Sequence, residues 1–313
     1  MHYLLYGAGA LGQALGCMLA ADGHQVTLVM RKRYIDVIDR DGLTVNGIFG
    51  TYHAGRDQLT PVESITGGDG STFDAILITT KSYDTATAVR DIASLEDCTC
   101  PVVSMQNGCG NVEQLADEFG VERSFGARVI TGFEIEQPAR VTITVSADDV
   151  HIGSCRPGTI PAPASAIADA IDRAGLPCRA VSDVHRSLFA KLLYNCTLNP
   201  LGAILGVNYG RLSELADTRQ IMDRVIDETF RVISAMGAEL EWETPEQYSK
   251  TFYDTLLPAT YDHRPSMLQD LEQGKPTEIE ALSGYVSRNG KTHGLETPYC
   301  DLLCSLIRFR EQV

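Results

Sequence analysis

The chain opens with His2-Tyr-Leu-Leu-Tyr6, an apolar run that leads directly into Gly7-Ala-Gly9-Ala-Leu-Gly12. A helix-like segment follows to about Ala21, and residues 25–30 then read as a second strand. This order of strand, glycine turn, helix and strand is the context of a dinucleotide-binding fingerprint. Gly7 permits a tight turn, Gly9 lets the backbone approach a pyrophosphate, and Gly12 lets helix and strand pack closely. The predicted contacts to the dinucleotide come from Gly7, Ala8, Gly9, Ala10, Leu11 and Gly12. The alternative is a glycine-rich turn in an ordinary α/β protein.

The end of the second predicted strand indicates which dinucleotide binds. Enzymes that use NAD usually place Asp or Glu there, about 20 residues after the glycines, to hold the ribose hydroxyls. This chain has Arg31-Lys-Arg33 there and no acidic residue before Asp36. Three cations suit a 2′-phosphate, so the sequence predicts NADPH rather than NADH. A basic helix start on the surface is the alternative.

Two further polar residues follow predicted strands. An apolar run from Phe73 to Thr80 leads into Lys81, and residues 101–105 lead into Gln106-Asn107-Gly108. In an open parallel sheet, ligands bind outside the carboxyl ends of the strands. Lys81 and Asn107 therefore join the glycines and Arg31 in one predicted cofactor site. Taken alone, Lys81 would be a surface residue and Asn107-Gly108 a turn.

The remaining pattern divides the chain in two. Short alternating runs between residues 121 and 155 predict antiparallel strands that complete the sheet, followed by a helix at 161–174 and a strand at 176–181. Helical periodicity then dominates, with segments at 184–206, 218–236, 248–257, 277–288 and 297–310. The predicted fold class is α/β: an amino-terminal Rossmann-type dinucleotide-binding domain (residues 1–182) followed by an all-helical carboxy-terminal domain (residues 183–313). A chain of 313 residues is long enough for two cores.

The first long helical segment carries a polar stripe. Lys191, Asn195 and Asn199 are spaced four residues apart, so they share one helix face, while Leu, Phe, Tyr and Cys occupy most of the other positions. An ammonium group is costly to bury without a polar partner. The stripe therefore faces a ligand, a satisfied polar seam inside a helix bundle, or solvent. Pro200 follows at once and is expected to kink the helix.

Composition excludes several classes of protein. The formal net charge of −15 argues against a nucleic-acid partner, whose binding rests on clustered cations. No apolar run is long enough to span a membrane, and the strand-like start leaves no room for a signal peptide. The nine cysteines include no zinc-type pair, so no metal site is predicted and reduced thiols in a cytoplasmic protein are expected. Cys98 and Cys100 lie in a predicted loop where they could oxidise.

The chain resembles the ketopantoate reductase (2-dehydropantoate 2-reductase) family from the first glycine to about residue 300. The lysine–asparagine–asparagine–proline helix and the Ser266-Met-Leu-Gln-Asp270 segment are more specific than the glycine motif. The other matching segments are Arg31, Thr80-Lys81, Gln106-Asn107-Gly108 and Thr277-Glu278-Ile279.

The resemblance implies roles for these residues. The glycines and Arg31 would hold NADPH, Lys191 would act as general acid, and Glu278 would help position the substrate. The residues around the nicotinamide and a small-molecule 2-keto acid would be Lys81, Asn107, Asn195, Asn199 and Ser266. The chain departs from the family at Tyr209 and His263, where asparagines are often or sometimes found and where contact with the substrate is expected. Glu278 has an alternative role as a carboxylate at a helix start.

Three functions compete. The first is NADPH-dependent reduction of ketopantoate to pantoate, for coenzyme A synthesis. The second keeps this chemistry on a different 2-keto acid, with Tyr209 and His263 reshaping the pocket. The third is a non-catalytic nucleotide-binding redox sensor, which would have no need of Lys191 and Glu278. A homodimer formed through the helical half is compatible with all three.

Overall fold

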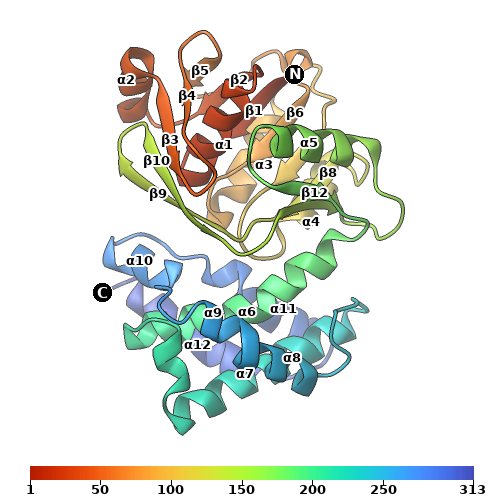
Figure 1. The fold of residues 1–313 in the computed structure, drawn as a ribbon. Coiled ribbons are helices and arrows are strands. Elements are labelled where there is room, and N and C mark those ends of the chain that lie inside the picture. Colours follow the sequence, from red (N-terminus) through yellow and green to blue (C-terminus); the bar gives the residue numbers. More distant parts are fainter. The chain divides into compact units, whose positions relative to one another are not determined.

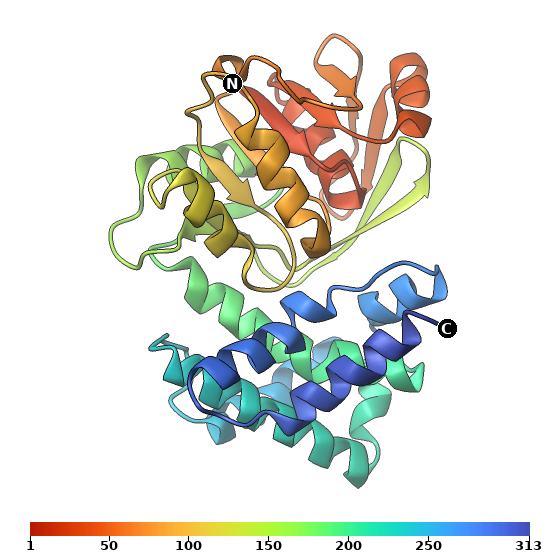
Figure 2. The ribbon, with the colours of Figure 1, turned by 180° about the vertical axis from the view of Figure 1, so that it is seen from behind.

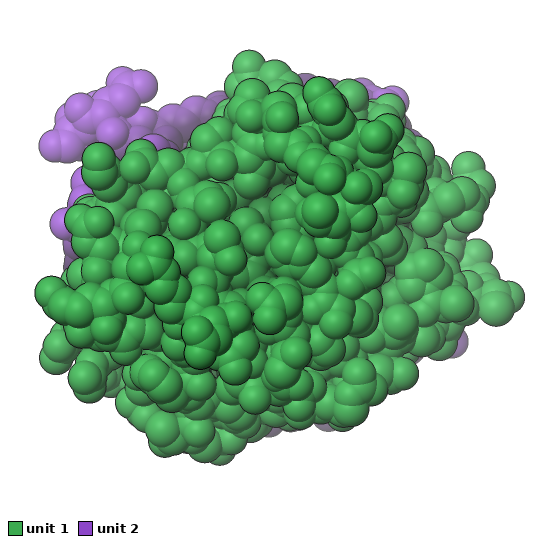
Figure 3. All heavy atoms as spheres, turned by 90° about the horizontal axis from the view of Figure 1, so that it is seen from above, with its two compact units in different colours: residues 1–107, 111–184 green, residues 108–110, 185–313 purple.

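The computed structural model describes residues 1–313 and divides into two compact units (Figure 1). The first unit comprises residues 1–107 and 111–184, and the second comprises residues 108–110 and 185–313 (Figure 3). The assignment of separate functions to residues 1–182 and 183–313 stays a prediction.

An eight-stranded sheet forms the centre of the first unit, in the order β12-β11-β8-β7-β6-β1-β2-β5. All neighbouring strands are parallel except β8 and β11, which are antiparallel. The middle strands are apolar and almost wholly buried, as expected for a parallel sheet covered on both faces. The strands are β1 (His2–Tyr6), β2 (Gln25–Val29), β5 (Leu59–Val62), β6 (Ala75–Ile78), β7 (Val102–Ser104), β8 (Ser124–Arg128), β11 (Val150–Ser154) and β12 (Cys178–Ala180).

Helices cover both faces of this sheet. The core on one face includes α1 (Ala10–Ala21) and α5 (Ala162–Arg173). The core on the other face includes α3 (Thr85–Ala93) and α4 (Asn111–Phe119), which are orange and dark yellow in Figure 2. The fifth helix, α2 (Lys32–Asp41), follows β2. This arrangement confirms the predicted Rossmann-type fold.

A second sheet covers α1 from outside. It has the order β4-β3-β10-β9 and consists of β3 (Leu43–Gly47), β4 (Tyr52–Ala54), β9 (Thr131–Gln137) and β10 (Arg140–Ser146). The apolar side chains of β3 and β10 join α1 in one core, so α1 is buried from Gly12 to Ala20. The prediction that all strands between residues 121 and 155 complete the main sheet was therefore wrong for β9 and β10. Alternating polarity marks a half-buried strand without identifying the layer that its apolar face covers.

The second unit is helical, as predicted. Its helices are α6 (Val184–Leu205), α7 (Ala216–Ala235), α8 (Pro245–Thr251), α9 (Leu257–Ala259), α10 (Ser266–Glu272), α11 (Ser283–Thr292) and α12 (Pro298–Arg310), with a π-helical turn at Phe252–Leu256 and 3₁₀ turns at Gly210–Ser213 and Ile279–Ala281. Helix α6 continues through Pro200. The predicted helix at 277–288 was wrong in its first half, because Leu282 adopts φ −106° and ψ −110° and separates the 3₁₀ turn from α11. Glu278 thus precedes a short turn rather than a long helix.

No helix combines the length and apolar character that crossing a lipid bilayer requires. All nine cysteines are free thiols. The sulfur atoms of Cys98 and Cys100 lie 3.8 Å apart.

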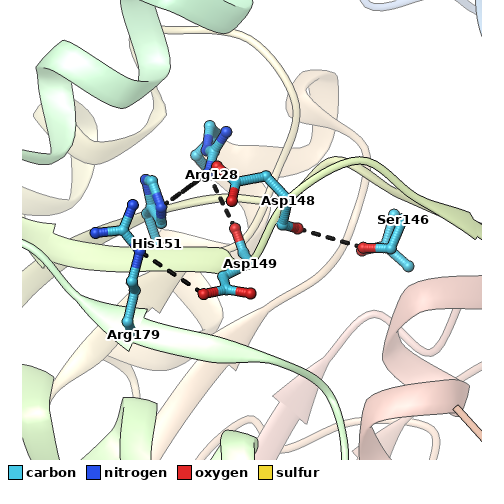
Figure 4. Close-up of polar contacts among 7 residues, drawn as sticks. Arg128, Ser146, Asp148, Asp149, His151 and Arg179 are labelled. Carbon is cyan, nitrogen blue, oxygen red and sulfur yellow. Dashed lines mark hydrogen bonds and ion pairs between the residues drawn. The ribbon is translucent and has the colours of Figure 1, made fainter. Parts of the chain in front are cut away.

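A polar cluster around the buried His151 links β8 to β11, the antiparallel pair of the main sheet (Figure 4). The Arg128 guanidinium donates to Asp148 Oδ2 at 2.6 Å and to Asp149 O at 3.0 Å, and lies 2.9 Å from His151 Nε2. Since the guanidinium only donates, His151 accepts through Nε2 and is neutral. Burial lowers the pKa of His151 to about 4, and the Arg128 and Arg179 cations act in the same direction.

We predict that His151 makes the protein less stable in mild acid. His151 binds a proton near pH 6.5 in the unfolded chain but only near pH 4 in the folded protein. Its contribution to stability is therefore complete above pH 6.5 and is lost as the pH falls from 6.5 towards 4. The free energy of unfolding should fall by about 1–2 kcal/mol between pH 7 and pH 5 from this residue alone. Urea denaturation of the wild type and of His151→Gln measures the effect.

The exposed His53 on β4 provides a matched control. His53→Gln should keep the wild-type loss of stability, and His151→Gln should lose less than the wild type. An equal loss in wild type and His151→Gln would remove His151 as the cause.

Candidate active site

The turn between β1 and α1 is shaped by contacts that only glycine permits. Gly7 has φ +101°, and a Cβ atom placed on it would lie 2.2 Å from Thr80 Cγ2. A Cβ atom on Gly12 would lie 2.5 Å from Thr79 Oγ1 and 2.6 Å from Gly7 O. A Cβ atom on Gly9 would have nothing within 4 Å. The first and third glycines are therefore required by the protein's own packing, whereas the space beside Gly9 is open to a ligand.

Two side chains that the sequence analysis overlooked hold this turn. Thr79, just after β6, donates through Oγ1 to Gly7 O at 2.6 Å. Gln13, buried in α1, donates through Nε2 to Ala8 O at 2.9 Å. Both bonds fix carbonyl groups. The N–H groups of Gly7 and Ala8 donate to Val29 O, and that of Gly9 donates to Gly7 O, so the donors left for a phosphate are the first N–H groups of α1 itself.

Parallel pairing places the predicted cofactor residues along one edge of the sheet. Strands β7, β6, β1 and β2 are consecutive neighbours and run in the same direction. Asn107, Lys81, the glycine turn and Arg31 each follow one of these strands within a few residues. The sheet thus brings together at its carboxyl edge four segments that are far apart in the sequence.

Gln106 organises two of these segments. Its buried side chain donates to Thr85 Oγ1 at 2.8 Å and to Lys81 O at 3.2 Å, and its oxygen accepts from Ser104. Asn111 accepts from Thr85 and donates to Asn107 O at 3.1 Å. The turns that carry Lys81 and Asn107 are therefore tied together by buried hydrogen bonds. A buried glutamine after a strand was the available signal, and its partners are visible only in the fold.

The cationic segment lies at the start of α2. Arg31, Lys32 and Arg33 are all exposed. The Arg33 guanidinium lies 4.8 Å from the centre of the Tyr34 ring and donates to its hydroxyl. Arg31 and Lys32 are the cations best placed to meet a phosphate at the end of β2.

The second unit carries the α6 stripe. Lys191 is half-buried, whereas Asn195 and Asn199 are 6% and 3% exposed. Asn199 Oδ1 accepts from Tyr209 Oη at 3.0 Å and from Ser266 Oγ at 3.4 Å. The structure thus joins Asn199 and Ser266 through a direct contact. It adds Tyr209, which the sequence had marked as a departure from the family pattern at a position where contact with the substrate is expected.

The segment before α10 is held against Tyr209. Tyr209 N donates to His263 O at 3.1 Å, and Gly210 N donates to Tyr261 O at 2.8 Å. The rings of Tyr209 and His263 lie 5.1 Å apart. His263 and Ser266 are both exposed, so this pairing presents two predicted substrate residues from one short segment.

Glu278 is buried, at 8% exposure, in a stretch that is fixed from both sides. Thr277 N donates to Glu311 Oε1 at 2.7 Å, and Ala281 N donates to Glu278 O at 3.1 Å. Residues 108–110, which follow Asn107 in the chain, dock here: Cys109 N donates to Ala281 O at 2.8 Å.

Family models match both parts of the chain. The model described as ketopantoate reductase PanE/ApbA matches residues 3–157, and the one described as ketopantoate reductase PanE/ApbA C terminal matches residues 183–311. The chain belongs to the ketopantoate reductase family. The resemblance seen in the motifs is thereby confirmed, and the chain is a member of a family of oxidoreductases.

Relatives extend this likeness over the whole length. A 2-dehydropantoate 2-reductase of Aquifex aeolicus is 35% identical over 99% of this chain and 97% of its own length. A 2-dehydropantoate 2-reductase of Pyrococcus horikoshii is 28% identical over 100% of this chain and 98% of its own length. Among solved structures, a PanE/ApbA family ketopantoate reductase from Ralstonia eutropha has a TM-score of 0.85 at 27% identity, covering 100% of this chain and 99% of the other. A ternary structure of D-mandelate dehydrogenase with NADH and anilino(oxo)acetate has a TM-score of 0.86 at 27% identity, covering 100% and 98%.

The glycine geometry generates a paired prediction. Gly12→Ala should lower both the thermal stability and the affinity for the dinucleotide, because its methyl group meets Thr79 Oγ1 and Gly7 O below 3 Å. Gly9→Ala should keep the melting temperature and still weaken the dinucleotide by about tenfold or more, since its methyl group fills only the ligand's space. Calorimetry and fluorescence titration with NADPH measure the two effects. Wild-type affinity in Gly9→Ala would place the pyrophosphate elsewhere.

Proposed function

We propose that this chain catalyses the NADPH-dependent reduction of ketopantoate to pantoate. The observation that carries the proposal is the α6 stripe with its Ser266 partner, in a chain 35% identical over 99% of its length to a 2-dehydropantoate 2-reductase. In this proposal residues 1–182 bind the cofactor, and residues 183–313 bind the substrate and supply the catalytic groups.

Cofactor binding rests on the carboxyl edge of the main sheet. The open space beside Gly9 and the free N–H groups at the start of α1 suit a pyrophosphate. The exposed Arg31 and Lys32 suit the 2′-phosphate that distinguishes NADPH from NADH. In this proposal Ala10 and Leu11 contribute main-chain N–H contacts and Ala8 lines the same turn. Lys81 and Asn107 contact the nicotinamide half from the neighbouring turns.

The chain's own residues complete the chemistry. NADPH, when bound, supplies the hydride that reaches the ketone carbon. Lys191 donates a proton from Nζ to the oxygen that becomes negative at that moment, which turns the ketone into an alcohol. A carboxylate such as Glu278 favours the protonated form of a neighbouring amine and helps position the substrate. Asn195, Asn199 and Ser266 bind the oxygen atoms of the keto acid, and His263 borders the same site.

A second candidate function is reduction of a different 2-keto acid with the same residues. It is favoured by the rings of Tyr209 and His263, 5.1 Å apart, beside Asn199 and Ser266. The structural neighbour named D-mandelate dehydrogenase was solved with anilino(oxo)acetate, which is an aromatic 2-oxo acid derivative. A bulkier or aromatic keto acid is the substrate of this candidate.

We place the reaction in the cytoplasm, because thiols such as the nine free cysteines persist in reducing compartments. Association into a homodimer is part of the proposal. Its support is an apolar stripe on α12, where Leu302, Leu306 and Phe309 are 55%, 40% and 62% exposed.

Substitution of Lys191 tests the mechanism. Lys191→Ala should bind NADPH as the wild type does and lose turnover by about a hundredfold or more, because the alkoxide then lacks its proton donor. The decrease of NADPH absorbance after adding ketopantoate measures turnover, and fluorescence titration measures binding. Full turnover in Lys191→Ala would remove the lysine from the mechanism.

The same assay separates the candidate functions. A series of 2-keto acids, including aromatic ones, is compared with ketopantoate by kcat/KM. Ketopantoate should give the highest value. A higher value for another keto acid supports the second candidate, and no oxidation of NADPH with any of them would refute both.

Substitution of Arg31 tests the cofactor assignment. Arg31→Ala should weaken NADPH by roughly tenfold and NADH much less, because only NADPH offers a 2′-phosphate for a charge-assisted hydrogen bond. Arg40→Ala is the matched control, since Arg40 lies in the last turn of the same helix and pairs with Asp41 at 2.7 Å. Equal losses for both cofactors in Arg31→Ala would contradict the assignment.

A further inference from the structure

We propose that Tyr209 is a positioning residue that orients the Asn199 amide, so that Asn199 presents its N–H group to an oxygen of the substrate. This inference rests on the proposed reduction of a 2-keto acid. The Asn199 N–H is the group that the site offers to that acid, and Tyr209 is the residue that keeps it in place.

The contacts of Asn199 define the orientation. Its side chain is buried, and its oxygen accepts from the Tyr209 hydroxyl at 3.0 Å and from the Ser266 hydroxyl at 3.4 Å. An amide oxygen has two lone pairs, and both are occupied here. The nitrogen lies on the other branch of the planar amide, pointing away from these two hydroxyls, so the group remaining for a ligand is a donor.

Burial of Tyr209 makes this orientation the stable one. Tyr209 is 2% exposed, and burial raises the pKa of its hydroxyl well above 10, so the hydroxyl keeps its proton. A buried hydroxyl proton needs an acceptor, and Asn199 Oδ1 is that acceptor. Rotating the amide by 180° would place the NH₂ group against the hydroxyl and leave its proton unpaired.

The main chain and the ring of Tyr209 are fixed independently of Asn199. The hydrogen bonds from Tyr209 N to His263 O and from Gly210 N to Tyr261 O hold its backbone. A Cβ atom on Gly210 would lie 2.1 Å from the Tyr261 ring, so the two segments are in close contact. The Tyr209 ring packs edge-on against the Tyr194 ring at 5.8 Å. The hydroxyl therefore has a defined position from which to direct Asn199.

The orientation matches the chemistry of a 2-keto acid. Its ketone and carboxylate oxygens are acceptors, and the reacting end carries no hydrogen-bond donor. Asn199 lies on the same face of α6 as Asn195 and Lys191, four and eight residues along the chain. Its amide nitrogen is therefore a further hydrogen-bond donor on the face that carries the Lys191 ammonium. An amide turned the other way would present an oxygen to the substrate's oxygens.

Removing one hydroxyl group tests this assignment. Tyr209→Phe keeps the ring contacts and should raise KM for the preferred 2-keto acid about three- to tenfold, with kcat and the affinity for NADPH changed by less than about twofold. Tyr194→Phe is the matched control. It removes a hydroxyl from the same aromatic cluster, but this hydroxyl bonds to Thr260 rather than to Asn199. It should leave KM unchanged.

A double-mutant cycle decides whether Tyr209 acts through Asn199. Asn199→Ala should raise KM by itself, and adding Tyr209→Phe should then change KM no further. The inference would be overturned if Tyr209→Phe changed KM equally in the wild type and in Asn199→Ala, or if it left KM unchanged. It would also be overturned if Tyr209→Phe lowered the melting temperature and lowered only kcat. A wild-type protein that reduces no 2-keto acid would instead refute the proposed function.

Discussion

The hydrogen bond from Thr79 Oγ1 to Gly7 O is the contact on which the carboxyl edge of the main sheet depends. It joins the end of β6 to the turn after β1, at a place where a methyl group on Gly7 or Gly12 would collide with the chain. Because β1 and β6 are parallel neighbours, this contact also fixes where the turn after β6 begins. Gln106, in the turn after β7, then donates to Thr80 and Lys81 and so connects its own turn to the turn after β6. A few hydrogen bonds thus hold three segments of the sheet's carboxyl edge in register.

The helical unit solves a different physical problem. Its first helix must bury apolar side chains on most faces and still display an ammonium and two amides on one face. Buried amides are costly unless they are hydrogen-bonded. The oxygen of Asn199 is satisfied by two hydroxyls that come from a turn and from the start of α10. The polar stripe is therefore part of the unit's packing as well as the proposed binding surface.

The elements that the sequence predicted well were those governed by local rules. The glycine turn follows from backbone sterics, and α6 follows from its apolar periodicity and four-residue polar spacing. Elements that depend on distant partners were not predictable. Strands β9 and β10 join β3 and β4 in a separate sheet over α1, and the break at Leu282 interrupts a helical pattern. The roles of Thr79, Gln106 and Tyr209 depend on partners up to 72 residues away, as in the bond from Thr79 to Gly7. Lys81 and Asn107 do follow strands β6 and β7, as predicted, and their place in the cofactor site stays a prediction because neither residue has a signal of its own.

Charge adds a last constraint on the proposed chemistry. A chain with a net charge of −15 repels both NADPH and a keto acid at long range. Screening reduces that repulsion beyond about 10 Å at ordinary ionic strength, so nearby groups decide binding. On the cofactor side these are the exposed cations at the start of α2 and the first N–H groups of α1. On the substrate side of the proposed site they are Lys191 and a set of neutral donors. Neutral donors bind an anion without adding a second cation near the ammonium, so in the proposed mechanism Lys191 stays the dominant cation for the oxygen that receives the proton.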